Sequence, residues 1–247
     1  MEENNQESYL FDFFEDLPRQ GPGSPDLTRS ALRVIDSLSP QSRILDIGCG
    51  TGAQTEVIGE ETHARVIALD IRISYIHHLL RTRILNRIYG IAGSMLDLPF
   101  MPGSFDLIWC EGAAYILGLE GALREWNRYL KPCGFIMISE AVWWTSNPSQ
   151  EIRAFWDREY PSIGTVESNI TLATNLGYTV LATLRLPSEV WWSSIYTPLE
   201  EKVYRVLPGS KDEGEMAFLY KILEEIDMFR NYHEEYGYVY FVLRSNR

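Results

Sequence analysis

Residues 44–52 read Ile44-Leu-Asp-Ile-Gly-Cys-Gly-Thr-Gly52, a short apolar run that ends in three closely spaced glycines. A helical pattern begins shortly after them, at Gln54. Glycine adopts backbone conformations that are closed to other residues, and it lets a ligand approach the main chain closely. The stretch therefore predicts a buried strand, a ligand-binding turn and a helix, in that order.

Similar apolar runs recur along the chain and alternate with helical patterns. The predicted strands cover 43–47, 65–70, 87–92, 105–110, 134–139, 178–184 and 237–243. The predicted helices open at Pro25 and cover 54–60, 74–86, 119–130, 149–158, 165–176, 198–207 and 213–233. This alternation is typical of βαβ units, in which helices join parallel strands. We predict a three-layer α/β fold of Rossmann-like type, with a seven-stranded, mostly parallel sheet and helices on both faces.

The sequence contains no internal repeat and no long linker, so we expect a single domain over residues 1–247. Residues 1–38 are expected to form N-terminal helices and a lid, and residues 39–140 the cofactor-binding core. Residues 141–247 are expected to add a helical cap and the final strands.

Composition narrows the class of protein. The chain has 22 Lys and Arg against 34 Asp and Glu, a formal net charge of −12, so the basic surface that binds nucleic-acid phosphates is not expected. The N-terminus is acidic where a signal peptide is positively charged, and no apolar run approaches the roughly 18 residues of a membrane span. Three cysteines without C-x-x-C spacing indicate neither a disulfide framework nor a zinc site. We expect a cytoplasmic protein that does not span a membrane.

Two kinds of cofactor use a glycine-rich turn after a strand. Gly48, Gly50 and Ala53 satisfy the G-x-G-x-x-G/A spacing of dinucleotide-binding proteins, so an NAD(P)-dependent oxidoreductase remains open. Asp46 favours S-adenosylmethionine (SAM), because a carboxylate beside the turn repels a pyrophosphate but suits an ammonium and a sulfonium. Asp70 ends the next strand, where its carboxylate can accept hydrogen bonds from the ribose hydroxyls of either cofactor.

The order of these motifs resembles that of the class I SAM-dependent methyltransferases over roughly residues 40–140. Asp46-Ile-Gly-Cys-Gly-Thr-Gly52 is similar to the first motif of that family, and Phe105-Asp-Leu-Ile-Trp-Cys-Glu111 to its fourth-strand motif. Leu130-Lys-Pro-Cys-Gly134 resembles the turn before strand five. The loop Arg19-Gln-Gly-Pro-Gly-Ser24 and the triplet Glu111-Gly-Ala113 resemble small-molecule members related to the quinone-biosynthesis methyltransferases. The resemblance implies an antiparallel last strand.

The resemblance also implies a set of cofactor contacts. Asp70 corresponds to the acid that binds the ribose, Ile71 to the residue that packs on adenine, and Ser94 with Met95 to the adenine edge. Many relatives carry an acid where Ser94 stands, and a serine hydroxyl can still bond the adenine amino group. The implied cofactor-binding residues are Arg19, Asp46, Gly48, Cys49, Gly50, Thr51, Gly52, Gln54, Asp70, Ile71, Ser94, Met95 and Glu111.

Glu111 follows the fourth strand, where the acceptor of such enzymes meets the methyl group. A carboxylate there suits a general base or an anchor for a protonated amine, although a rim carboxylate without a chemical role is equally compatible. Tyr115 is the second catalytic candidate. Tyr115, Trp144 and Trp192 are candidate walls of the acceptor pocket, with core packing as the alternative. Three tyrosines that alternate on the last strand are predicted to pack within the sheet: Tyr236, Tyr238 and Tyr240.

Residues 8–24 are predicted to fold over the cofactor as a lid. The resemblance to the family places such a segment there. Arg19 is expected to pair with the methionine carboxylate of SAM, while Tyr9, Phe11 and Phe13 form an apolar underside.

The sequence therefore predicts a SAM-dependent methyltransferase that acts on an N, O, S or C nucleophile of a small molecule. Such a reaction needs alignment and exclusion of water, and no metal ion. The expected partner is the methyl acceptor, with no nucleic acid and no membrane, and a homodimer is compatible with the sequence. An NAD(P)-dependent oxidoreductase and a non-catalytic SAM-binding protein remain the alternatives.

Overall fold

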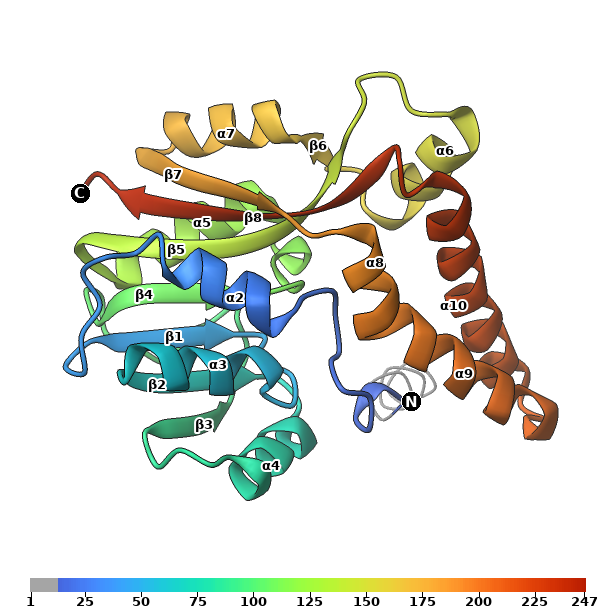
Figure 1. Cartoon of the computed structure of the whole chain (residues 1–247), viewed down its shortest axis with the longest axis horizontal. Helices are drawn as coiled ribbons and strands as arrows, with labels where there is room; N and C mark the ends of the chain where they lie inside the picture. Colours follow the sequence, from blue (N-terminus) through green and yellow to red (C-terminus); the bar gives the residue numbers. More distant parts are fainter. Residues whose placement is uncertain (1–12) are drawn as a thin grey trace.

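A central sheet organises the computed structural model, which describes residues 13–247. Seven strands form it in the order β3-β2-β1-β4-β5-β8-β7 (Figure 1). Their bounds are β1 (Arg43–Ile47), β2 (Arg65–Asp70), β3 (Ile88–Ala92), β4 (Phe105–Cys110), β5 (Leu130–Trp143), β7 (Tyr178–Arg185) and β8 (Tyr236–Ser245). Strands β1 to β5 are parallel, and β8 runs antiparallel to both of its neighbours. The predicted mostly parallel sheet with an antiparallel last strand is confirmed.

One further strand was not predicted. The two-residue strand β6 (Gly164–Thr165) pairs with the end of β5, beyond the part of β5 that contacts β4. Strand β5 is also longer than the predicted 134–139, because its carboxyl half continues past the end of β4 alongside β8. This extension carries β5 side chains beyond the edge of the parallel sheet.

Helices cover both faces of the sheet, which gives the predicted three layers (Figure 1). On one face lie α2 (Pro25–Leu32), α3 (Ala53–Thr62) and α4 (Ile73–Thr82), and on the other lie α5 (Gly118–Trp126) and α7 (Val166–Asn175). The first group buries Ile58 and Leu79 against alternate residues of β1, β2 and β4. The second group buries Leu123 and Trp126 against the opposite side of the same strands. Strand periodicity of two assigns each apolar side chain to one of these two cores.

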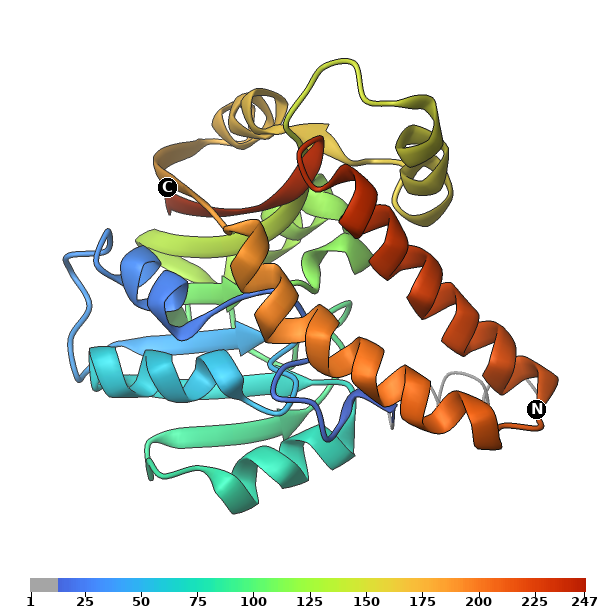
Figure 2. The ribbon, with the colours of Figure 1, turned by 45° about the vertical axis from the view of Figure 1, so that its right-hand side comes forward.

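A helical cap extends beyond the carboxyl ends of the parallel strands (Figures 1 and 2). It consists of α6 (Gln150–Glu159), α8 (Ser188–Trp191), the π-helix η3 (Trp192–Tyr196), α9 (Thr197–Val206) and α10 (Glu213–Tyr232). These helices share a third apolar core, in which the Trp191 ring lies 4.3 Å from that of Phe229 and 5.5 Å from that of Tyr196. The helical turns at 188–196 were not predicted from the sequence, because this aromatic packing, rather than local propensity, supports them.

The N-terminal segment crosses from the cap to the sheet. Phe13 packs in the cap core, and the chain then passes over the end of β1 before Ser24 caps α2 by accepting a hydrogen bond from the Leu27 amide at 3.1 Å. Residues 8–12 of the predicted lid, with Tyr9 and Phe11, lie outside the described residues. Within residues 13–247, no helix has the length and apolar character that crossing a membrane requires.

Candidate active site

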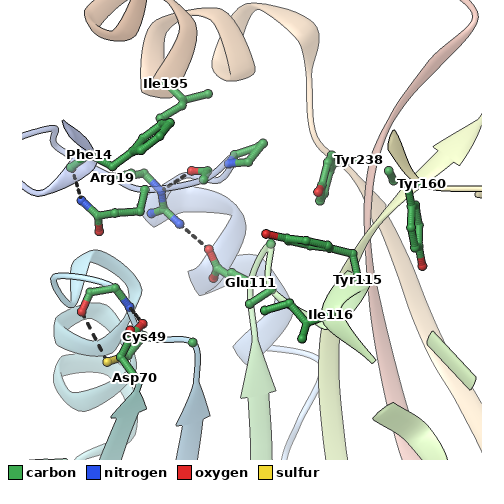
Figure 3. A pocket seen from close by; sticks show the side chains of 18 of the residues that line it. Phe14, Arg19, Cys49, Asp70, Glu111, Tyr115, Ile116, Tyr160, Ile195 and Tyr238 are labelled. Carbon is green, nitrogen blue, oxygen red and sulfur yellow. Dashed lines mark hydrogen bonds and ion pairs between the residues drawn. The ribbon is translucent and has the colours of Figure 1, made fainter. Parts of the chain in front are cut away.

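A cavity of about 640 Å³ lies between the carboxyl edge of the sheet and the cap. Small-molecule sites usually occupy about 300–1,000 Å³ and, in open α/β sheets, lie at this edge. Figure 3 shows Cys49 and Asp70 on one side of this space, the Arg19–Glu111 pair near its centre, and Tyr115, Tyr160 and Tyr238 on the other side. The cavity thus has a glycine-turn end and a tyrosine-rich end.

The glycine-rich turn forms the first end. Gly48 and Gly50 have φ values of +69° and +56°, which other residues rarely adopt. A Cβ atom on Gly48 would lie 2.5 Å from Cβ of Ala113, and one on Gly50 would lie 2.5 Å from Oε1 of Gln20. The turn is therefore a cradle that only glycine can form, and it leaves main-chain atoms open to a ligand.

Asp70 lies beside this cradle at the end of β2. One carboxylate oxygen accepts a hydrogen bond from the Gly50 amide at 2.9 Å, and the other accepts from the Arg72 amide at 2.9 Å. The side chain is 9% exposed, and burial raises its pKa above the usual value. Because each carboxylate oxygen has two lone pairs, both can accept a further bond from a ligand hydroxyl.

The predicted adenine contacts line the same end of the cavity. Ile71 is 64% exposed and offers an apolar surface, while Ser94 and Met95 lie nearby in the wall. Cys49 and Gln54 also line this end, so their predicted contacts with the cofactor stay predictions. Tyr75, from α4, is a lining residue that the sequence analysis missed, since its position on the inner face of a helix resembled ordinary core packing.

Asp46 does not reach the cavity, which corrects the expectation that it meets the cofactor directly. Its side chain is fully buried and accepts hydrogen bonds from the hydroxyl of Thr55 at 2.6 Å and the amide of Gln54 at 3.3 Å. Burial raises the pKa of Asp46 to about 7. The carboxylate thus ties the start of α3 to β1 from behind the glycine-rich turn.

Thr51 and Gly52, which were also predicted to bind the cofactor, are not among the residues that line the cavity. The amide and hydroxyl of Thr51 donate to Oε1 of Gln20 at 2.8 and 2.9 Å, and Gly52 packs against Leu79. The Gln20 side-chain amide in turn donates to the Phe14 carbonyl at 3.0 Å. Gln20 therefore fastens the N-terminal segment to the glycine-rich turn. Sequence patterns missed it because its partner is far away in the chain.

The N-terminal segment is fastened a second time by the buried ion pair between Arg19 and Glu111. Nη1 of Arg19 is buried and has no hydrogen-bond partner among the described residues. The predicted bond from Arg19 to a methionine carboxylate stays a prediction, and Nη1 is the atom left for it. The apolar underside predicted for Phe13 is wrong, because that ring packs in the cap core instead.

Glu111 is held by more than Arg19. One carboxylate oxygen accepts from the Thr28 hydroxyl at 2.8 Å and from the Trp109 indole at 2.9 Å, and the other also accepts from the Tyr240 hydroxyl at 2.8 Å. These donors occupy both oxygens of Glu111. The geometry therefore favours Glu111 as an anchor that joins α2, β4, β8 and the N-terminal segment, rather than as a general base. Tyr240 accordingly does more than pack within the sheet.

Tyr115 is the predicted acceptor-pocket residue that the structure places in the wall. It comes from the 3-10 turn η1 (Ala114–Ile116), is 54% exposed on the cavity side, and its ring lies 6.5 Å from that of Tyr160. Tyr238, predicted to pack within the sheet, also lines the cavity (Figure 3). It does so because β8 meets the cap at this point.

Trp144 and Trp192 do not line the cavity, which corrects their assignment as acceptor walls. Trp144 packs under the Arg185 guanidinium at 4.2 Å, and Trp192 packs near that of Arg230 at 5.2 Å. The neighbouring Trp191 lines the cavity instead. Adjacent helical residues project about 100° apart, so the Trp-Trp pair alone did not indicate which ring faces inward.

Two carboxylates at the tyrosine-rich end were also missed. Glu140 lies on β5 just past Ile138, the last residue of that strand that pairs with β4, and Glu225 lies on α10. Glu140 carried a usable signal, because an acid directly after the predicted strand 134–139 is expected at the carboxyl edge. No sequence pattern indicated Glu225, since charged residues are common on helices.

Comparison with known proteins agrees with this geometry. Residues 45–138 match the family described as "Methyltransferase domain". The 24-methylenesterol C-methyltransferase 2 of Oryza sativa subsp. japonica is 27% identical over 184 residues, which cover 66% of this chain and 50% of that protein. Demethylmenaquinone methyltransferase of Corynebacterium urealyticum is 30% identical over 119 residues, which cover 48% of this chain and 50% of that protein. The matches span between 22% and 56% of the length of these curated relatives and others like them.

A solved structure extends the likeness to most of the chain. The SAM-dependent methyltransferase from Geobacter sulfurreducens, in complex with S-adenosyl-L-homocysteine, has a TM-score of 0.78 at 20% identity. The match covers 94% of this chain and 96% of that one. The fold is therefore that of the class I, Rossmann-like methyltransferases. Residues 45–138 match the methyltransferase domain family, and a demethylmenaquinone methyltransferase is among the relatives of the chain.

Proposed function

We propose that this protein is a SAM-dependent methyltransferase that acts on a small molecule. The observation that carries the proposal is the glycine cradle with the Asp70 carboxylate at one end of a cavity whose other end is lined by tyrosines. The match of residues 45–138 to a methyltransferase domain supports it. We further propose that the whole chain works as one cytoplasmic domain without nucleic-acid partners, consistent with its net charge of −12.

The residues at the glycine-turn end fit SAM. Asp70 would accept hydrogen bonds from the ribose hydroxyls, Ile71 and Met95 would contact adenine, and the orphaned Nη1 of Arg19 would bind the methionine carboxylate. When bound, SAM supplies a methyl group activated by a positively charged sulfur. The protein aligns the acceptor, and the N-terminal segment that crosses the end of β1 excludes water.

In the reaction, the lone pair of the acceptor forms a bond to the methyl carbon while the carbon–sulfur bond breaks, and its electron pair stays on sulfur. In this proposal Tyr115, which lines the cavity, contacts the acceptor. Glu111 acts in this proposal as a positioning residue, because its donors hold both of its oxygens.

Binding and turnover test the proposal together. Calorimetry should show binding of SAM and S-adenosylhomocysteine and no comparable binding of NADH. Tighter binding of NADH would instead favour the oxidoreductase reading of Gly48, Gly50 and Ala53. Turnover of SAM to S-adenosylhomocysteine should then appear with a member of a panel of small amines, phenols, thiols and quinone precursors.

Cofactor binding without turnover on any acceptor would favour the non-catalytic alternative. The size of the cavity argues against that alternative, because its tyrosine-rich end would be left without a ligand. The relatives act on acceptors as different as sterols and demethylmenaquinone, so their names do not identify this one.

A further inference from the structure

The tyrosine-rich end of the cavity contains more negative charge than its structural contacts explain. We define it as the cap compartment, lined by Tyr115, Glu140, Tyr160, Tyr196, Glu225 and Tyr238. We propose that this compartment binds the acceptor through an ammonium group held by Glu140 among the tyrosine rings, while Glu225 adds negative charge from the facing helix α10. The inference rests on the proposed function and adds to it the chemical class of the acceptor.

Glu140 is the first observation. It is 3% exposed, and one oxygen accepts from the Ala141 amide at 3.2 Å. The Tyr160 hydroxyl is a polar neighbour of this carboxyl group, but the other oxygen, Oε2, is buried and has no hydrogen bond of ordinary geometry in the described part of the chain. Buried polar groups are almost always hydrogen-bonded, so an orphaned carboxylate oxygen in the wall of a cavity points to a donor supplied by a ligand.

Glu225 is the second observation. It faces the same compartment from α10, on the opposite side from the sheet, and accepts a hydrogen bond from the Tyr196 hydroxyl at 2.8 Å. Lys221, one helical turn earlier, pairs with Glu159 at 2.8 Å. Among the described residues, neither Glu140 nor Glu225 forms an ion pair with a basic side chain.

The other basic residue in the cavity wall, Arg19, also forms an ion pair. Arg19 pairs with Glu111 near the centre of the cavity, between the cap compartment and the glycine-turn end (Figure 3). A cation entering the cap compartment would therefore meet Glu140, which no basic side chain pairs with among the described residues, and Glu225, whose charge Lys221 offsets in part. Attraction between opposite charges is strong in such a closed space, because the local dielectric constant is lower than that of water.

The aromatic side chains complete the site. Burial raises the pKa of the Tyr115, Tyr160 and Tyr238 hydroxyls, so these rings stay neutral. Tyr115 and Tyr238 project into the same space in Figure 3. Neutral aromatic faces attract ammonium ions, and the remaining apolar surface can cover a hydrophobic body. An amine attached to an apolar or aromatic group matches this combination better than an anionic acceptor does.

The chemistry of transfer is consistent with this class. A primary or secondary ammonium must lose one proton before its nitrogen has a lone pair. Glu140 is the acceptor for that proton, because it lines the cavity with an oxygen that no described residue hydrogen-bonds, and because burial raises its pKa to about 7. The nitrogen then forms its bond to the methyl carbon as the carbon–sulfur bond breaks. The titratable groups that face Glu140 are Tyr160, Tyr238 and the Cys110 thiol, and all three are neutral.

The test compares two probes with the same apolar body, one ending in an ammonium group and the other in a neutral hydroxyl. Calorimetry in the presence of S-adenosylhomocysteine should show phenethylamine binding at least about tenfold more tightly than phenethyl alcohol, as expected for one charged hydrogen bond. Equal affinities, tighter binding of the alcohol, or no binding of the amine would overturn the inference. This comparison uses the unmodified protein and so does not depend on any variant folding.

Two variants locate the effect. Glu140→Gln should weaken phenethylamine binding by about 10- to 150-fold, Glu225→Gln should weaken it by a smaller factor, and both should leave phenethyl alcohol binding unchanged. Glu224→Gln is the matched control, because its side chain lies next to Glu225 on α10 but pairs with Arg158. Equal loss of amine binding in the control, or none in the two variants, would remove the two carboxylates from the site.

Binding of S-adenosylhomocysteine separates this inference from the proposed function. If the unmodified protein fails to bind S-adenosylhomocysteine, the proposed function fails. If it binds S-adenosylhomocysteine and shows no preference for the amine, the methyltransferase proposal stands and only the ammonium site is wrong.

Discussion

Asp70 combines two tasks in one side chain, since it braces the glycine-rich turn through the Gly50 amide and faces the cavity. Asp70→Ala should weaken SAM by about 10- to 150-fold, because each hydrogen bond to a charged group contributes about 1.5–3 kcal/mol. Calorimetry measures the affinity, and Asp157→Ala, an exposed carboxylate outside the cavity, is the control. Unchanged SAM affinity in Asp70→Ala would exclude the ribose contact.

Glu111 shows how a residue chosen for chemistry can serve structure. Glu111→Gln leaves the buried Arg19 without its counter-ion and turns one acceptor oxygen into a donor that faces other donors. We expect the free energy of unfolding to fall by about 2–4 kcal/mol. Urea unfolding measures this loss.

The matched control for that experiment is Glu120→Gln, which breaks an exposed ion pair with Arg124. It should change the free energy of unfolding by less than about 1 kcal/mol. If Glu111→Gln instead keeps full stability and loses only turnover, Glu111 is the general base that the sequence suggested.

At the scale of elements, the N-terminal segment is attached to the sheet at two points. Trypsin cleaves after Arg19, which is 7% exposed, so cleavage there requires the segment to detach. Gln20→Ala removes the bonds to Thr51 and should accelerate cleavage after Arg19. S-adenosylhomocysteine should slow cleavage in the unmodified protein if the segment covers the cofactor.

Mass spectrometry of a digestion time course measures both effects. Gln41→Ala, at an exposed position before β1, is the control for a Gln substitution that leaves the segment attached. A cleavage rate that S-adenosylhomocysteine does not change would contradict the role of the segment as a lid.

At the scale of the whole molecule, buried carboxylates make stability depend on pH. Burial raises the pKa of Glu140 from 4.5 to about 7, so between these values the folded protein holds a proton that the unfolded chain has lost. The contribution of Glu140 to stability therefore falls as pH rises through this window. Above pH 7 the full cost of burying the charge is present.

Glu140→Gln removes this dependence, although the new amide has its own constant effect on stability. The free energy of unfolding of the variant minus that of the unmodified protein should be about 1–3 kcal/mol larger at pH 8 than at pH 5. Urea unfolding at both values measures the difference, with Glu224→Gln as the control that should follow the unmodified protein. A difference that stays constant with pH would show that Glu140 is already charged at pH 5.

The local sequence was sufficient to predict the central strands of the sheet and the glycine-turn end of the cavity. The strands predicted at 43–47, 65–70 and 105–110 match β1, β2 and β4. The glycine-rich turn and Asp70 lie together as predicted, because strand periodicity and glycine chemistry act over neighbouring residues, and parallel strands bring their carboxyl ends to one edge.

Only the tertiary structure decided the partners of the charged and aromatic side chains. Arg19 and Glu111 are 92 positions apart, and Glu140 and Glu225 line one cavity because the cap folds over the extended end of β5. The inward turn of Trp191 rather than Trp192 likewise depends on the aromatic core of the cap. Such pairings depend on how separate elements pack, and periodicity within one element contains no information about that packing.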